Sequence, residues 1–104
     1  MDTKGLKELE SLDRSRLVRK MQEVLPDMRE ELGLHLDTIS EMSGIDIGYL
    51  REVENGKREM SWRHFLTLLF IFWGSDKSRE MIEEKGLFPE ELKQALSVNR
   101  NIHI

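Results

Sequence analysis

The chain has 104 residues, 16 Lys and Arg against 20 Asp and Glu, a formal net charge of −4 and no cysteine. This length fits a single domain, and the lack of cysteine excludes a disulfide scaffold, a thiolate zinc site and a cysteine nucleophile. The longest unbroken apolar run, Leu68 to Trp73, is about a third of what a bilayer-spanning helix needs, and no secretion signal is visible. We therefore expect a soluble, cytoplasmic protein without a membrane segment.

The spacing of apolar residues is helical along the chain, and no stretch alternates apolar and polar residues for long enough to form a strand. The N-terminal part is predicted to form helices over roughly 5–12, 14–25 and 26–32. Pro26 suits the first turn of a new helix. The last two segments are therefore either separate helices or one helix kinked at this proline.

Two short helices are predicted near the centre of the chain. The first covers about 36–43, and Gly44 stops it. The second is capped by Asp46 and runs to about Glu54, where Asn55-Gly56 forms a turn. This is the layout of a helix-turn-helix: two short helices are joined by a turn that contains a glycine and an apolar residue. The second helix of such a motif can enter a DNA major groove.

The C-terminal third begins with a strongly apolar helix. Ser61 is expected to cap it, and its apolar residues, over 62–73, cover nearly the whole circumference. This is more than one face can bury, so an exposed remainder would mark a protein interface. Helices over 77–85 and 89–97 follow.

These elements predict an all-α, compact domain of five to seven helices. We divide it into an N-terminal helical extension (1–24), a helix-turn-helix core (25–73), C-terminal helices that can support dimerisation (74–97) and a loose tail (98–104).

Four strings in this core resemble one known family. They are M-R-E-E-L-G-L (28–34), I-S-E-M-S-G-I (39–45), L-R-E-V-E-N-G-K-R (50–58) and S-W-R-H-F-L-T-L-L-F-I-F (61–72). Together they resemble the Cro/cI-type (Xre-like) helix-turn-helix transcriptional regulators, over about half of the chain. The resemblance implies a lambda-repressor-like fold and a DNA-binding regulator that acts as a homodimer on a palindromic operator in double-stranded DNA.

The resemblance also implies which residues meet DNA. The matching positions of the recognition helix and the loop after it are Asp46, Ile47, Gly48, Arg51, Glu52, Asn55, Lys57 and Arg58. Ile47 can touch a thymine methyl, Glu52 can accept from a cytosine amine, and Arg51 can reach guanine or phosphate. Asn55 would offer its backbone amide to a phosphate, and Lys57 and Arg58 would add positive charge.

The net charge of the helix-turn-helix segment is unfavourable for DNA binding. Residues 34–60 hold three cations and six carboxylates, a net charge of −3, whereas phosphate binding needs a basic face. Leu36 stands where the family often has a Gln that contacts phosphate. The positive charge gathers instead at Arg14, Arg16, Arg19 and Lys20, which form either a DNA-contacting arm or a solvated helix face.

A second function class is therefore kept open. The stretch over 33–56 also resembles, more weakly, the helix-turn-helix domain of the bacterial scaffold RodZ. That resemblance implies a protein-interaction module that keeps the fold without binding DNA.

Nothing in the sequence predicts catalysis or metal binding. His35, His64 and His103 stand singly, and there is neither a nucleophile elbow nor a glycine-rich phosphate loop. We expect a protein that is not an enzyme and that uses no metal or other cofactor.

Overall fold

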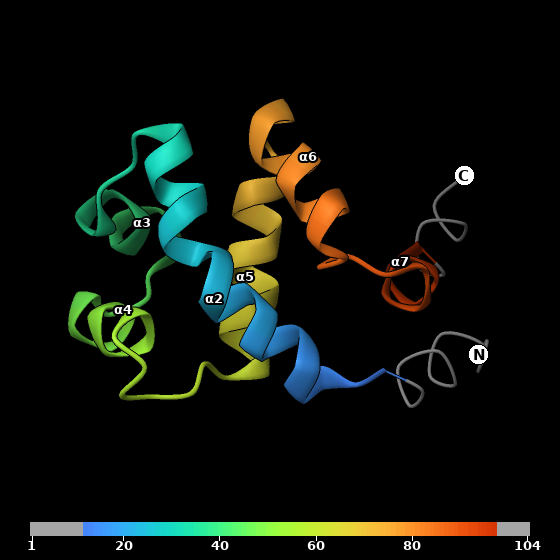
Figure 1. Cartoon of the computed structure of the whole chain (residues 1–104), viewed down its shortest axis with the longest axis horizontal. Coiled ribbons are helices and arrows are strands. Elements are labelled where there is room, and N and C mark those ends of the chain that lie inside the picture. The colour runs from blue at the N-terminus through green and yellow to red at the C-terminus, as the bar shows by residue number, and fades with distance from the viewer. Residues whose placement is uncertain (1–11, 98–104) are drawn as a thin grey trace. The chain divides into compact units, whose positions relative to one another are not determined.

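The computed structural model describes residues 12–97, and within that range its regular structure is six helices and no strand (Figure 1). The helices are α2 (Arg14–Leu32), α3 (Leu36–Ser43), α4 (Ile47–Glu54), α5 (Trp62–Trp73), α6 (Asp76–Lys85) and α7 (Glu90–Ser97). The predicted all-α class is confirmed. The predicted tail 98–104 and the predicted helix over 5–12, except for Leu12, lie outside the described residues.

The chain divides into two compact units. The larger unit, Arg14–Leu87, contains α2 to α6 and every residue predicted to meet DNA. Helix α7 belongs to the smaller unit. None of the helices over 12–97 combines the length and the hydropathy needed to cross a bilayer.

Helix α2 settles the alternative that the sequence left open at Pro26. The proline lies inside one helix of 19 residues, at the cost of one backbone hydrogen bond. One apolar face continues past it and keeps both halves of the helix on the same core. The buried residues of this face are Leu17, Val18, Met21, Val24, Leu25 and Met28.

The turn between α3 and α4 is built as the sequence predicts. Gly44 adopts a left-handed conformation with φ of 76°, which favours glycine, and its N–H donates to the Ser40 carbonyl. The Ser40 hydroxyl donates in turn to the Ile45 carbonyl at 2.6 Å. Ile45 itself is buried. These bonds and this apolar plug hold α3 and α4 side by side, as Figure 1 shows.

Helix α5 has a buried face and an exposed one. Ser61 caps it by accepting a hydrogen bond from the His64 N–H, as predicted. Its buried residues are Phe65, Leu68, Leu69 and Phe72. Phe70, in contrast, is 82% exposed. The prediction that this helix has more apolar surface than its own core can bury is confirmed for that residue.

Candidate nucleic-acid interface

Helix α4 is oriented by its two buried side chains. Leu50 and Val53 are both buried on its inner face. Because a helix turns by about 100° per residue, Arg51 then lies on the outer side, where it is exposed. Ile47, one turn before Arg51, is half-buried. The outer face of α4 therefore presents Arg51 to solvent with Ile47 next to it.

Asp46 and Gly48 shape the start of α4. The Asp46 carboxylate accepts a hydrogen bond from the Tyr49 N–H at 3.1 Å, as an N-cap. A Cβ atom on Gly48 would lie 3.0 Å from the same carboxylate oxygen. Gly48 thus leaves room for the cap. Both residues have a structural role, whether or not they also meet DNA.

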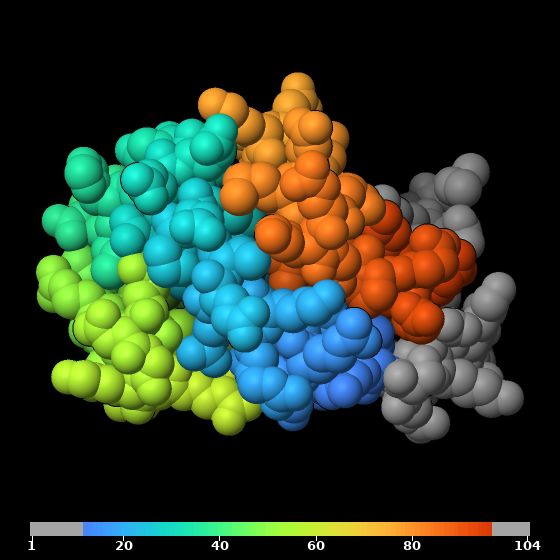
Figure 2. Space-filling model, in the orientation of Figure 1, coloured from blue at the N-terminus to red at the C-terminus, as the bar shows by residue number. Residues whose placement is uncertain are grey.

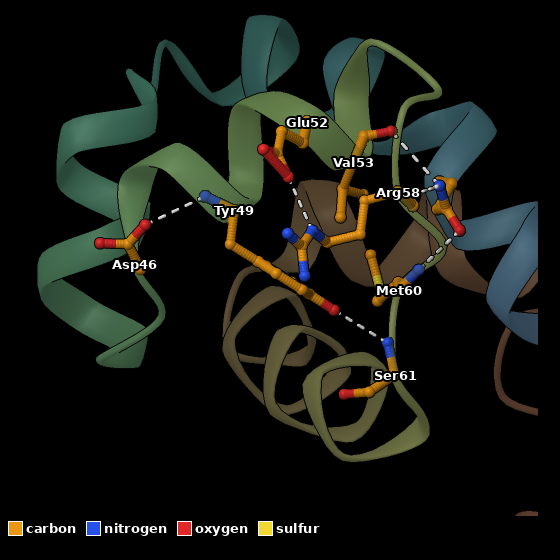
Figure 3. A network of polar contacts seen from close by, with 8 residues as sticks. Asp46, Tyr49, Glu52, Val53, Arg58, Met60 and Ser61 are labelled. Carbon is orange, nitrogen blue, oxygen red and sulfur yellow. Dashed lines mark hydrogen bonds and ion pairs between the residues drawn. The ribbon is translucent and has the colours of Figure 1, made fainter.

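Glu52 and Arg58 pair with each other. The Arg58 Nε donates to a Glu52 carboxylate oxygen at 2.7 Å, and this bond raises the pKa of Arg58. The Arg58 guanidinium also lies 5.3 Å from the centre of the Tyr49 ring (Figure 3). The pair is exposed, so its carboxylate and its cation are still in reach of a ligand, but each already neutralises the other.

The loop after α4 is held by Gln22 of α2. Its Nε2 donates to the carbonyls of Val53 at 3.3 Å and Arg58 at 3.1 Å, and its Oε1 accepts from the Met60 N–H at 2.9 Å. Figure 3 shows Val53 in the last turn of α4 and Arg58 and Met60 in the loop after it, and Figure 2 shows the loop (yellow-green) adjoining α2 (blue to cyan). One side chain therefore fixes both ends of the segment that carries Lys57.

The role of Gln22 is not visible in the sequence pattern. Its three partners lie 31 to 38 residues away along the chain. A glutamine on the border of an apolar helix face is in itself compatible with a solvated side chain. Only the packing of α2 against α4 reveals the role of this residue.

We expect Gln22→Met to lower the free energy of unfolding by about 1–2 kcal/mol, because it keeps the volume and leaves three backbone groups without their partner. Chemical denaturation of the variant measures this. Glu23→Met is the matched control: its side chain is exposed on the same helix, and a change within about 0.5 kcal/mol is expected. Equal stability of Gln22→Met and the parent would contradict the role of Gln22.

Tyr49 ties α4 to the start of α5. Its hydroxyl accepts a hydrogen bond from the Ser61 N–H at 2.9 Å (Figure 3). Its ring meets the His64 ring edge-on, with 4.6 Å between the ring centres. His64 is half-buried, and its Nδ1 is a buried atom without a hydrogen-bond partner. Burial, together with the charge of Arg63, lowers the pKa of His64.

This arrangement predicts a pH dependence of stability. Since the pKa of His64 is lower in the folded state, the unfolded state binds more protons below the ordinary imidazole pKa of about 6.5. The His64 contribution to stability should therefore fall as the pH falls from about 7 towards 5. His64→Phe keeps an aromatic ring and removes the titration, so its unfolding free energy should depend less steeply on pH than that of the parent. Identical slopes in urea denaturation would contradict this prediction.

Arg51 and Lys57 are the two exposed cations of the interface. Among residues 12–97, neither makes an ion pair. The backbone N–H of Lys57 donates to the Glu52 carbonyl at 2.8 Å, which holds the base of its side chain. The N–H of Asn55 donates to the Arg51 carbonyl at 3.0 Å. The Asn55 amide is thus engaged within the backbone, and its contact with a phosphate stays a prediction.

The charge of the Glu54 carboxylate is neutralised by an ion pair with Arg29. Two hydrogen bonds of 2.6 and 2.8 Å join the Arg29 guanidinium to both carboxylate oxygens of Glu54. The bond to Glu54 raises the pKa of Arg29. Arg29 also donates to the Leu34 carbonyl at 3.0 Å. This pair ties α4 to α2 and to the turn before α3. Because Arg29 lies outside residues 34–60, the charge count of that segment does not include the partner of Glu54.

The basic cluster of α2 does not act as one group. The Arg14 guanidinium lies 5.2 Å from the centre of a Trp62 ring. The Lys20 ammonium donates to the carbonyl of Lys85, the last residue of α6, at 3.1 Å. Arg19 is exposed and lines a shallow hollow of about 290 Å³ with Gln22 and Gly56. Of these cations, Arg19 is thus placed beside the loop that follows α4.

Comparisons with protein-family models, with curated proteins and with solved structures find no match to this chain. Among residues 12–97, no three His, Asp or Glu side chains gather in a way that could hold a metal ion.

Proposed function

We propose that this protein is a DNA-binding regulator of the helix-turn-helix type that acts as a dimer on a palindromic operator, with α4 in the major groove. The observation that carries the proposal is the exposed Arg51 on a helix whose position is fixed at both ends. Asp46 caps the start of α4 and Gln22 holds its last turn. A fixed helix is what reading base edges requires, because discrimination depends on where a side chain is placed.

The outer face of α4 offers two kinds of base contact. Arg51 is exposed and long enough to donate two hydrogen bonds to a guanine edge. Ile47, one turn earlier, offers apolar surface to a thymine methyl. Spaced by four residues, the two side chains lie on one side of α4 and would meet neighbouring base pairs.

Lys57 is proposed to contact the phosphate backbone. It is exposed in the loop directly after α4, and the loop is held by Gln22 at Val53, Arg58 and Met60. Contacts of this kind set the register of a protein on the duplex without reading its sequence.

The ion pair with Arg29, which lies outside residues 34–60, makes the net charge of this segment −2 rather than the −3 counted along the chain. Glu52 is paired with Arg58, and Glu54 with Arg29. The exposed carboxylates that remain in residues 34–60 are those of Asp37, Glu41, Asp46 and Glu59. With few cations available, binding should involve few phosphates and depend only moderately on salt.

The test is a titration of short random-sequence duplex DNA at several salt concentrations, followed by selection of any preferred site. Lys57→Ala should weaken binding to all sequences alike and reduce the salt slope by about one. Arg51→Ala should instead cost about 1–3 kcal/mol at one base pair and relax the preference there. Lys77→Ala is the matched control: this exposed lysine pairs with Glu31, away from α4.

A second candidate is a protein-interaction module, as in the scaffold-type interpretation of the sequence. The observation that favours it is Met42, which is 56% exposed on α3, next to Glu41 and one turn from Thr38. An exposed apolar side chain next to a carboxylate suits a basic protein partner better than DNA. A folded protein with no DNA affinity even at low salt would contradict the first proposal and support this one.

A further inference from the structure

Arg58, in the loop after α4, is held at three points. Its carbonyl accepts a hydrogen bond from the Gln22 side chain at 3.1 Å, which fixes the backbone. Its Nε donates to the Glu52 carboxylate at 2.7 Å, and its guanidinium lies 5.3 Å from the centre of the Tyr49 ring. Figure 3 shows the Arg58 side chain directed from the loop toward Glu52 and Tyr49 of α4. A long side chain that is mobile on most surfaces is thus restricted in position.

The Tyr49 ring, against which Arg58 packs, is itself fixed. Its hydroxyl accepts a hydrogen bond from the Ser61 N–H at 2.9 Å, and the ring meets the His64 ring with 4.6 Å between the centres. An arginine cation is attracted to the face of an aromatic ring. Because Tyr49 is anchored to the start of α5 on its other side, it supports the guanidinium instead of following its motion.

The two terminal nitrogens of Arg58 are available to a ligand. Within the described range 12–97, neither Nη1 nor Nη2 donates a hydrogen bond, and the Arg58 side chain is 52% exposed. A guanidinium holds its donors in a planar fork that matches two oxygens of one phosphate. Lys57, the proposed phosphate ligand, directly precedes Arg58 in the loop. An arginine whose Nε is occupied can still bind a phosphate through both terminal nitrogens.

We propose that Glu52 and Tyr49 position Arg58 to donate both terminal nitrogens to one phosphate of the DNA backbone, and that Glu52 acts through Arg58 rather than by accepting from a cytosine amine. Positioning the side chain in advance lowers the freedom that it loses on binding. A phosphate contact sets the place of α4 on the duplex and is the same for every sequence. This contact rests on the proposed function and adds a second phosphate ligand beside Lys57.

The test is a titration of the selected duplex DNA with carboxylate variants. Charge repulsion alone predicts that removing a carboxylate strengthens binding to DNA. Glu59→Ala is the matched control and should follow that rule, because Glu59 is exposed in the same loop and makes no ion pair with any residue of 12–97. Glu52→Ala should instead weaken binding at least about threefold, since Arg58 then has to be immobilised on binding. The loss should be alike for all sequences.

Glu52→Gln is the conservative variant. Its amide oxygen can still accept from the Arg58 Nε, so it should bind DNA at least as tightly as the parent. In an Arg58→Ala background, Glu52→Ala should weaken binding no further, because the side chain through which it acts is absent. In the free protein, the Arg58 Nε–Hε signal in nuclear magnetic resonance spectra should shift more in Glu52→Ala than in Glu52→Gln. Circular dichroism checks that each variant is folded.

The outcomes separate this contact from the proposed function. If the parent binds DNA and Glu52→Ala binds as tightly or more tightly, the positioning role of Glu52 is overturned and the proposed function stands. A loss confined to one base pair, a loss that persists without Arg58, or an unchanged Arg58 signal in Glu52→Ala would overturn it as well. A folded parent without DNA affinity would contradict the proposed function and the phosphate contact together.

Discussion

Leu50→Ala is expected to lower the free energy of unfolding by roughly 2–5 kcal/mol. The Leu50 side chain is fully buried on the inner face of α4. Removing it leaves a cavity at the place where α4 meets the rest of the larger unit, in addition to the lost burial of apolar surface. Chemical denaturation measures the change directly.

Leu50→Met is the control for this variant, because it nearly conserves volume and should cost less than about 1.5 kcal/mol. If Leu50→Ala unfolds at the same denaturant concentration as the parent, the assignment of Leu50 to the buried face of α4 is wrong. The outward direction of Arg51 would then be wrong as well, since both follow from the same helix orientation.

Arg29→Ala is expected to cost about 2–4 kcal/mol. The loss of one partner of a buried ion pair typically costs about 3–5 kcal/mol, because the other charge is left uncompensated. Here the Glu54 side chain is 11% exposed and that of Arg29 21%, so solvent reduces the penalty. Three hydrogen bonds of Arg29 are lost at the same time, including the one to the Leu34 carbonyl.

The double variant Arg29→Met, Glu54→Met removes both charges, so it shows how much of the loss in Arg29→Ala comes from leaving the Glu54 carboxylate without a partner. It should be more stable than Arg29→Ala, because no unpaired charge remains. The exposed pair of Lys77 and Glu31, at 3.3 Å, is the matched control, and Lys77→Ala should cost less than about 1 kcal/mol. Equal effects of Arg29→Ala and Lys77→Ala in urea denaturation would contradict the structural role given to Arg29.

Local chemistry accounts for what could be predicted from the sequence. The caps at Asp46 and Ser61 and the left-handed Gly44 depend on residues within four positions of one another. Such short-range signals specify where helices begin and end. The all-α class and the bounds of α3, α4 and α5 could therefore be derived without the structure.

The polar pairings could not be derived in this way. Arg29 reaches Glu54 over 25 residues, and Gln22 reaches Met60 over 38. These contacts exist only once α2 packs against α4, and no local pattern distinguishes them from solvated side chains. They change the candidate site, because Arg29, from outside residues 34–60, neutralises one carboxylate of a segment whose own residues have a net charge of −3.

The continuity of α2 was also hidden from local signals. Pro26 favours a helix start, yet the buried side chains on either side of it, Leu25 and Met28, belong to one face. Burial of that face outweighs the one hydrogen bond lost at the proline. Tertiary packing therefore decided between one helix and two at this proline.

The most direct test of the account is a titration of isotope-labelled protein with selected duplex DNA, followed by the amide signals in nuclear magnetic resonance spectra. If α4 enters the major groove, the largest shifts should fall on Ile47 to Arg51 and on Lys57, and Arg51→Ala should relax the sequence preference at one base pair of the selected site. Shifts confined to Asp37, Glu41 and Met42 of α3, or no shift at any DNA concentration, would contradict the proposal that α4 reads DNA.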